Sequence, residues 1–207
     1  AEGARNEALF VRKAHSRLEG FIQQTGFNAD AELVLNGVHL PPLRQILAES
    51  SAHLMMLGDV PAFVHGDLCL SNILYDSRMR AIKLIDPRGA DEDGQRMVYG
   101  SQLYDVAKLA HSIIGLYDHI VAGQYALSVD GQHFSFRIFG ADDVEEIQGA
   151  FRRHRFLPGV SARAIEKTLP LLFIAMLPLH ADSVSRQTAL LANAMRLYAD
   201  NFEDRLD

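Results

Sequence analysis

The sequence predicts one α+β domain that is mostly helical, and three observations lead to this fold class. Long segments near both ends of the chain, residues 4–24 and 183–202, repeat apolar residues at helical spacing. Short apolar runs between them are bounded by turn residues, which is typical of small β-hairpins. The chain has 207 residues, of which 48% are hydrophobic and 22% charged, so it can bury one core without disulfides or a structural metal.

Helical periodicity or helix-start signals mark six segments, at residues 4–24, 41–57, 101–116, 141–156, 162–180 and 183–202. Gly26 follows the first segment, and glycine often ends a helix in the left-handed conformation. Pro41 and Pro42 open the second, where the first turn tolerates proline. Ser161 and Ser183 precede the last two helices, and serine is a favoured N-cap.

Two β-hairpins are expected between the helices. Residues 73–75 and 81–85 form the arms of the first, around a turn at residues 76–80. The second hairpin covers residues 125–138, where Asp130-Gly131 is a strong turn signal between alternating segments.

Composition excludes several classes of protein. The formal net charge of -6 argues against a broad electrostatic contact with nucleic acid. No run of about eighteen apolar residues is present, so no membrane span is expected. The single cysteine, Cys69, rules out an internal disulfide framework and favours a reducing, cytoplasmic location, where we expect it to serve in packing. The histidines lack zinc-ligand spacing.

The informative stretch is VHGDLCLSNILYDSRMRAIKLIDPRG, residues 64–89. Its polar residues Asp67, Asn72 and Asp86 each stand at the edge of a short apolar strand. Because Asn72 begins one arm of the first hairpin and Asp86 ends the other, the hairpin brings them together. Asp67, one loop earlier, can face the same point.

Phosphoryl transfer needs a set of this kind. Mg²⁺ holds the anionic triphosphate and prefers oxygen ligands from a carboxylate or an amide. A further carboxylate orients the attacking hydroxyl and accepts its proton. These three side chains supply such parts, although turn formation is the common role of Asp and Asn.

At this point the chain resembles the aminoglycoside phosphotransferase and choline kinase family, small-molecule relatives of the protein kinases. The catalytic loop of that family reads His-Gly-Asp, four residues, Asn, followed by a hydrophobic strand and a metal-binding Asp. The resemblance implies a kinase-like C-terminal lobe that uses Mg²⁺ with ATP or another nucleoside triphosphate. It implies these roles: Asp67 as catalytic base, Asn72 and Asp86 as Mg²⁺ ligands, Leu74 and Ile85 beneath the nucleotide base, and Asp105 as support of the catalytic loop.

The strong resemblance covers residues 62–110, and the helical remainder at residues 139–207 is compatible with it. One departure is Asp86-Pro87-Arg88-Gly89, where the family has an aromatic residue after the metal-binding Asp. The other is the N-terminal β lobe, since only helical segments precede the motif, without a Gly-rich loop or a strand lysine. We therefore expect residues 1–207 to form a single C-terminal lobe, weak or inactive alone, whose partner is a missing N-terminal lobe or a fused upstream domain.

Several residues keep two interpretations at this stage. His65 fits a loop-organising residue better than a base, and Asp105 either caps its helix or supports the loop. Asp91 and Asp93 belong to an acidic run that is either a solvated loop or a contact for a cationic acceptor. Arg88 suits phosphates or an acceptor that carries phosphate or carboxylate. His180 either lines an acceptor cleft or marks a helix boundary.

The function expected from the sequence is transfer of the γ-phosphate of ATP or another nucleoside triphosphate to a small-molecule hydroxyl. A sugar or polyol, an amino alcohol and an aminoglycoside all remain open as acceptors. The alternative is a non-catalytic kinase-fold binding module within a larger biosynthetic protein. A metal-dependent phosphohydrolase needs more metal ligands than Asn72 and Asp86 supply.

Overall fold

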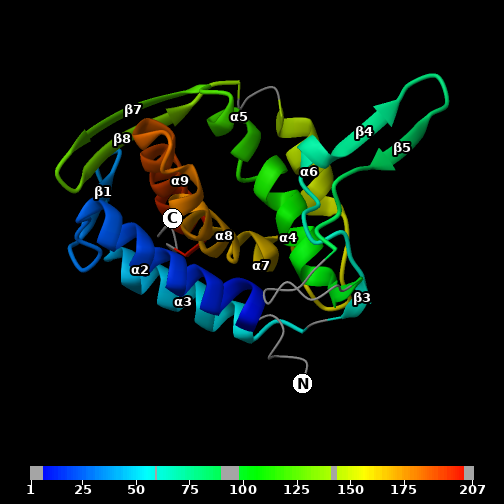
Figure 1. The fold of residues 1–207 in the computed structure, drawn as a ribbon, viewed down its shortest axis with the longest axis horizontal. Coiled ribbons are helices and arrows are strands. Elements are labelled where there is room, and N and C mark those ends of the chain that lie inside the picture. Colours follow the sequence, from blue (N-terminus) through cyan, green and yellow to red (C-terminus); the bar gives the residue numbers. More distant parts are fainter. Residues whose placement is uncertain (1–6, 59, 90–97, 141–143, 203–207) are drawn as a thin grey trace.

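The computed structural model describes residues 7–58, 60–89, 98–140 and 144–202. It has the expected mixed class, with helices that form the body and small sheets at its edges (Figure 1). Helix α8 (Leu169–Met176) lies at the centre, because it packs against α2 (Lys13–Thr25), α3 (Leu43–Met55), α4 (Gln102–Ile113) and α9 (Val184–Phe202). Seven of its eight residues are buried, as expected for a helix surrounded on all sides.

The N-terminal segment begins as a π-helical stretch, η1 (Glu7–Arg12), and continues as α2. Gly26 ends α2 with φ of 70°, so the predicted C-terminal signal is confirmed. The apolar side of this segment buries Phe10, Leu18 and Phe21 in the common core. Helix α3 occupies most of the predicted residues 41–57.

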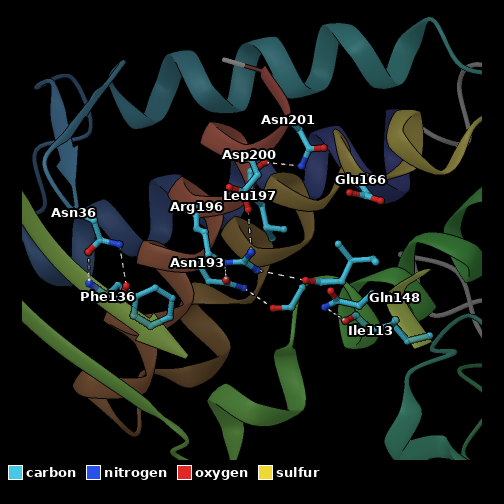
Figure 2. Close-up of polar contacts among 12 residues, drawn as sticks. Asn36, Ile113, Phe136, Gln148, Glu166, Asn193, Arg196, Leu197, Asp200 and Asn201 are labelled. Atoms are coloured by element: carbon cyan, nitrogen blue, oxygen red, sulfur yellow. Dashed lines mark hydrogen bonds and ion pairs between the residues drawn. The ribbon is translucent and has the colours of Figure 1, made fainter. Parts of the chain in front are cut away.

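A four-stranded sheet covers one end of the body, in the order β2-β1-β8-β7. The predicted hairpin at residues 125–138 is confirmed as β7 (Tyr125–Asp130) and β8 (His133–Ile138). The small hairpin β1 (Leu33–Leu35) and β2 (Val38–Leu40) was not predicted, although Asn36-Gly37 at its turn is a strong hairpin signal. Strand β1 then pairs in parallel with β8, and the Asn36 side chain bonds both backbone groups of Phe136 (Figure 2).

The segment that carries the motif lies on the other side of the body. Strand β3 (Pro61–Phe63) pairs with β6 (Tyr99–Ser101), which the sequence did not predict. A short 3-10 helix, η2 (Leu70–Asn72), leads into β4 (Ile73–Asp76) and β5 (Ala81–Leu84), the predicted first hairpin. This hairpin projects away from the helices (Figure 1). Ser101 caps α4 by accepting the Tyr104 N–H, and the short helix α5 (Tyr117–Val121) follows.

The C-terminal helices are α6 (Glu145–Arg153), α7 (Ala162–Glu166), α8, the 3-10 turn η4 (Leu177–His180) and α9. The expectation of one helix over residues 162–180 is wrong, because the segment divides into three pieces. Pro170 and Pro178 each lie at the start of a piece, where a residue without an N–H is tolerated. Ser161 and Ser183 accept the backbone N–H groups of Ala164 and Arg186, so both predicted N-caps are confirmed. The predicted start of α6 at residues 141–142 lies outside the described residues.

Buried polar contacts fix α9 against the end of α4. The Asn193 amide donates to the Gly115 carbonyl at 2.7 Å, and Arg196 donates to the Ile114 carbonyl at 3.3 Å (Figure 2). Such bonds satisfy carbonyls that the last turn of a helix leaves without a partner. Within the described ranges, no helix has the length and apolar content needed to cross a membrane.

Candidate active site

Asp105, in the first turn of α4, binds the backbone of the loop between β3 and η2. Its carboxylate accepts the backbone N–H of His65 at 2.7 Å and that of Gly66 at 2.8 Å. Hydrogen bonds to a charged acceptor are stronger than neutral ones, and Asp105 is 9% exposed, so water competes little. Of the two interpretations of Asp105, these contacts agree with loop support, since Ser101 is the N-cap.

Gly66 is required where it stands. Its φ is 78°, and a Cβ there would lie 2.8 Å from the Arg88 Cβ, closer than side chains approach. His65 bonds the Ile85 carbonyl through Nε2 at 2.8 Å and accepts the Asp67 N–H at Nδ1. The loop is thereby tied to the end of β5, as the loop-organising interpretation of His65 expects.

Asp67 faces a cation that the sequence did not single out. The Lys108 ammonium, one turn beyond Asp105 on α4, lies 2.8 Å from Oδ1 of Asp67. Its side chain is 10% exposed and that of Asp67 is 45% exposed, so the pair stands at the boundary of the core. Burial opposes the charge on Lys108, yet the neighbouring Tyr104 and Asp67 raise its pKa. Burial raises the pKa of Tyr104, which is therefore uncharged at neutral pH, so the Asp67 carboxylate is the group that stabilises the ammonium there.

Asn72 and Asp86 are brought together as the hairpin predicts. The Asn72 carbonyl accepts the Ile85 N–H at 3.0 Å, which joins the start of β4 to the residue before Asp86. The Asn72 amide nitrogen donates to the Asp67 carbonyl at 2.9 Å, so its side-chain oxygen remains available as a ligand. Asp86 has φ of 53° although Pro87 follows it, and residues before proline favour extended backbone. Such strain is often found at functional sites.

One cavity of about 420 Å³ joins these groups. Its polar lining includes Asp67, Asn72, Asp86, Lys108, Lys13 and Arg88. Its apolar wall comes from η1, α8 and η4 and includes Phe10, Leu172, Ala175, Met176 and Leu179. The volume is in the range of small-molecule sites, about 300–1,000 Å³.

Positive charge is concentrated on the helical side of this cavity. Lys13 has a pKa lowered to about 8, first by burial and then by the neighbouring charges of Arg88, Arg17 and Lys108. Arg17 is held by the Ala175 carbonyl at 2.6 Å. His111, also in the wall, lies between the rings of Tyr117 and Phe173, and burial lowers its pKa well below the usual value.

The other predicted site residues lie elsewhere. Leu74 and Ile85 are 49% and 38% exposed on the projecting hairpin and do not belong to the cavity lining. His180 is not part of the lining either. Its Nε2 forms a hydrogen bond with the hydroxyl of Tyr117, and Tyr117 does line the cavity. Asp91 and Asp93 lie outside the described residues. Buried Cys69 contacts the Ser71 hydroxyl at 3.2 Å, and both line the cavity.

Sequence reasoning missed Lys13, Lys108 and His111. Lys108 had a usable signal, since it follows Asp105 by three residues and therefore shares its helix face. Lys13 had none, because only the packing of α2 against α8 and η4 brings it to the loop.

The oxygen atoms of Asp86 and Asn72 are of the kind that Mg²⁺ prefers as ligands. Asp86 supplies a carboxylate and Asn72 an amide oxygen, and Mg²⁺ is commonly bound by one or two such groups plus substrate phosphates. Among the described residues, no three His, Cys, Asp or Glu side chains gather as a metal site. A closed, all-protein metal centre of those residue types is therefore absent from the described part of the chain.

Comparison with known proteins identifies no relative: no family model, curated protein or solved structure matches this chain.

Proposed function

We propose that this chain carries the catalytic loop of a phosphotransferase that moves the γ-phosphate of ATP, or of another nucleoside triphosphate, to a small-molecule hydroxyl. One observation supports it above the others. Asp105 holds the loop backbone so that Asp67, Asn72 and Asp86 all line one cavity of ligand size. The resemblance to the aminoglycoside phosphotransferase and choline kinase family, with its kinase-like C-terminal lobe, adds the expected role of each residue.

Asp67 acts in this proposal as the base that accepts the proton of the acceptor hydroxyl. The hydroxyl oxygen forms a bond to the γ-phosphorus, the bond from that phosphorus to the bridging oxygen breaks, and the nucleoside diphosphate leaves. Lys108 and Asn72 hold the Asp67 carboxylate toward the cavity. Asp86 and Asn72 would hold Mg²⁺, which neutralises phosphate charge.

The nucleotide base would lie against the face of the β4–β5 hairpin that carries Leu74 and, directly after β5, Ile85, both of which are exposed. An exposed apolar face of this kind is typical of a surface that another group covers. A nucleoside triphosphate donor and a chain with one cysteine, Cys69, both suit the cytoplasm, so we propose that location.

The test measures transfer of labelled phosphate from ATP to a panel of polyols, amino alcohols and aminoglycosides. Asp67→Asn is expected to lower turnover by about 10²–10⁴-fold, the usual contribution of a positioned base. Asp130→Asn makes the same chemical change in an exposed turn and should leave turnover unchanged. The assay is run on this chain and on any longer protein that contains it.

Two results contradict the proposal. Turnover of Asp67→Asn within tenfold of the unchanged protein removes Asp67 as the base. Mg²⁺-dependent ATP binding without transfer to any acceptor class favours the alternative, a non-catalytic kinase-fold binding module.

A further inference from the structure

Two cations in the cavity form no ion pair among the described residues, although the Asp67 carboxylate lies near enough to Lys13 to offset part of its charge. Lys108 pairs with Asp67, and Arg17 donates to a carbonyl, but neither Lys13 nor Arg88 forms an ion pair with a described carboxylate. Both line the cavity, and their charges interact, since Arg88 contributes to the low pKa of Lys13. Both side chains are partly buried, and removing a cation even partly from water favours pairing with an anion, so this arrangement favours a ligand that brings negative charge.

The nucleotide is the less suitable source of that charge. Lys13 comes from α2 and shares the cavity with the apolar wall of Leu172 and Met176, on α8. The exposed hairpin face that suits the nucleotide base contributes neither Leu74 nor Ile85 to this cavity. In an in-line transfer the acceptor approaches the γ-phosphate from the side opposite the leaving group, so the helical side belongs to the acceptor.

We propose that the acceptor is a small polyol that already carries a phosphate or carboxylate group, and that Lys13 and Arg88 bind this group. The inference rests on the proposed phosphotransferase function, because it names the second substrate of the same site. The Arg88 guanidinium can bind either anion through two parallel hydrogen bonds, and Lys13 adds a point charge.

The rest of the cavity fits such a molecule. Its volume of about 420 Å³ accommodates a ligand of monosaccharide size, and Phe10 and Met176 can pack against the carbon skeleton. With the anion at Lys13 and Arg88, a hydroxyl of the same molecule would lie beside Asp67 at the end of the cavity formed by the loop. A cationic acceptor, such as an amino alcohol or an aminoglycoside, would meet two like charges and bind poorly.

Isothermal titration calorimetry on this chain tests the assignment without requiring turnover. The probes are glucose 6-phosphate and glycerol 3-phosphate, glucuronate and glycerate, the neutral sugars glucose and glycerol, and the cation glucosamine. The phosphates and carboxylates distinguish the two possible anions. The variants are Lys13→Met and Arg88→Met, with Lys83→Met and Arg163→Met as controls that remove exposed charges away from the cavity.

We expect at least one anionic probe to bind tenfold or more tightly than its neutral counterpart. Lys13→Met and Arg88→Met should each weaken that binding about tenfold, while the two controls should not. Far-ultraviolet circular dichroism verifies that each variant is folded. Glucosamine should bind no better than glucose.

Equal binding of charged and neutral probes, or no binding of any anionic probe, overturns the inference. So does a loss of Mg²⁺-ATP affinity in Lys13→Met and Arg88→Met with unchanged affinity for the anionic probes, since both cations then serve the nucleotide. A third outcome would refute the inference alone and leave the phosphotransferase function intact. In this outcome phosphate is transferred to a neutral polyol, the transfer depends on Asp67, and neither Lys13→Met nor Arg88→Met changes its rate. Tight anion binding without any phosphate transfer would refute the function, and the bound anion would then be a ligand of Lys13 and Arg88 but not an acceptor.

Discussion

Replacing Asp105 by Asn is expected to destabilise the protein and to disable the loop at once. The two carboxylate oxygens of Asp105 accept two neighbouring N–H groups, at 2.7 Å and 2.8 Å. Asparagine keeps one acceptor oxygen and directs its NH₂ group at the other N–H, so one bond becomes a contact between two donors. The substitution is nearly isosteric, which means that packing changes little.

The magnitude follows from these two contacts. A hydrogen bond to a charged group contributes about 1.5–3 kcal/mol, and a buried donor left without a partner costs about 1–3 kcal/mol. The two terms overlap, so we expect a loss of about 2–4 kcal/mol in the free energy of unfolding. For a chain of this size each kcal/mol shifts Tm by about 2–4 °C, which predicts a decrease of roughly 5–15 °C.

Thermal unfolding followed by circular dichroism measures this change, and Asp130→Asn is the matched control in an exposed turn. Phosphate transfer measured well below Tm should also fall, because Asp67 depends on the backbone that Asp105 holds. A Tm within 2 °C of that of the unchanged protein, or full transfer activity in the folded variant, would refute the reasoning about the loop.

Two further predictions concern the cavity. Asp86→Ala should abolish most Mg²⁺-dependent nucleotide binding and Asn72→Ala should weaken it less, since a carboxylate is the stronger ligand for a hard cation; calorimetry with unchanged affinity in Asp86→Ala would contradict the metal assignment. Lys108→Met should lower kcat by about ten- to a hundredfold with a smaller change in KM, because Asp67 loses the cation that positions it. An unaltered kcat would remove Lys108 from the site.

The sequence was sufficient where the determinants are local. The hairpin β4–β5, the turn at Asp130-Gly131 and the serine N-caps each depend on residues within a few positions, so their patterns predict them. The same holds for the order of Asp67, Asn72 and Asp86 around one hairpin. The hairpin β1–β2 carried a local signal at Asn36-Gly37 that was overlooked.

The rest depends on contacts between distant segments. The parallel pairing of β1 with β8 joins residues about 100 positions apart, and no local pattern encodes that register. The division of residues 162–180 reflects how α7, α8 and η4 pack against different neighbours. Likewise, the cationic side of the site combines Lys13 from α2 with Arg88 from the loop after β5. The sequence motif contains Arg88 but not Lys13.

Lys13 supplies the last prediction, because its position should make the protein less stable at neutral pH. Its pKa falls from the ordinary 10.5 to about 8, first through burial and then through Arg88. Between these values the unfolded chain binds a proton that the folded chain lacks, so stability increases as the pH rises through this interval. The penalty is fully present below about pH 8.

Lys13→Met removes the group that causes this penalty. One pKa unit corresponds to about 1.4 kcal/mol, and partial exposure reduces the full value, so the variant should be more stable by about 1–3 kcal/mol at pH 7. The gain should shrink to about a quarter of its full value by pH 10, because Lys13 in the unfolded chain titrates at 10.5. Urea unfolding at both pH values measures it, with exposed Lys83→Met as the control. A gain that is equal at both pH values, or a loss at pH 7, would show that the cavity already compensates the charge of Lys13 and would remove the main reason for expecting an anion there.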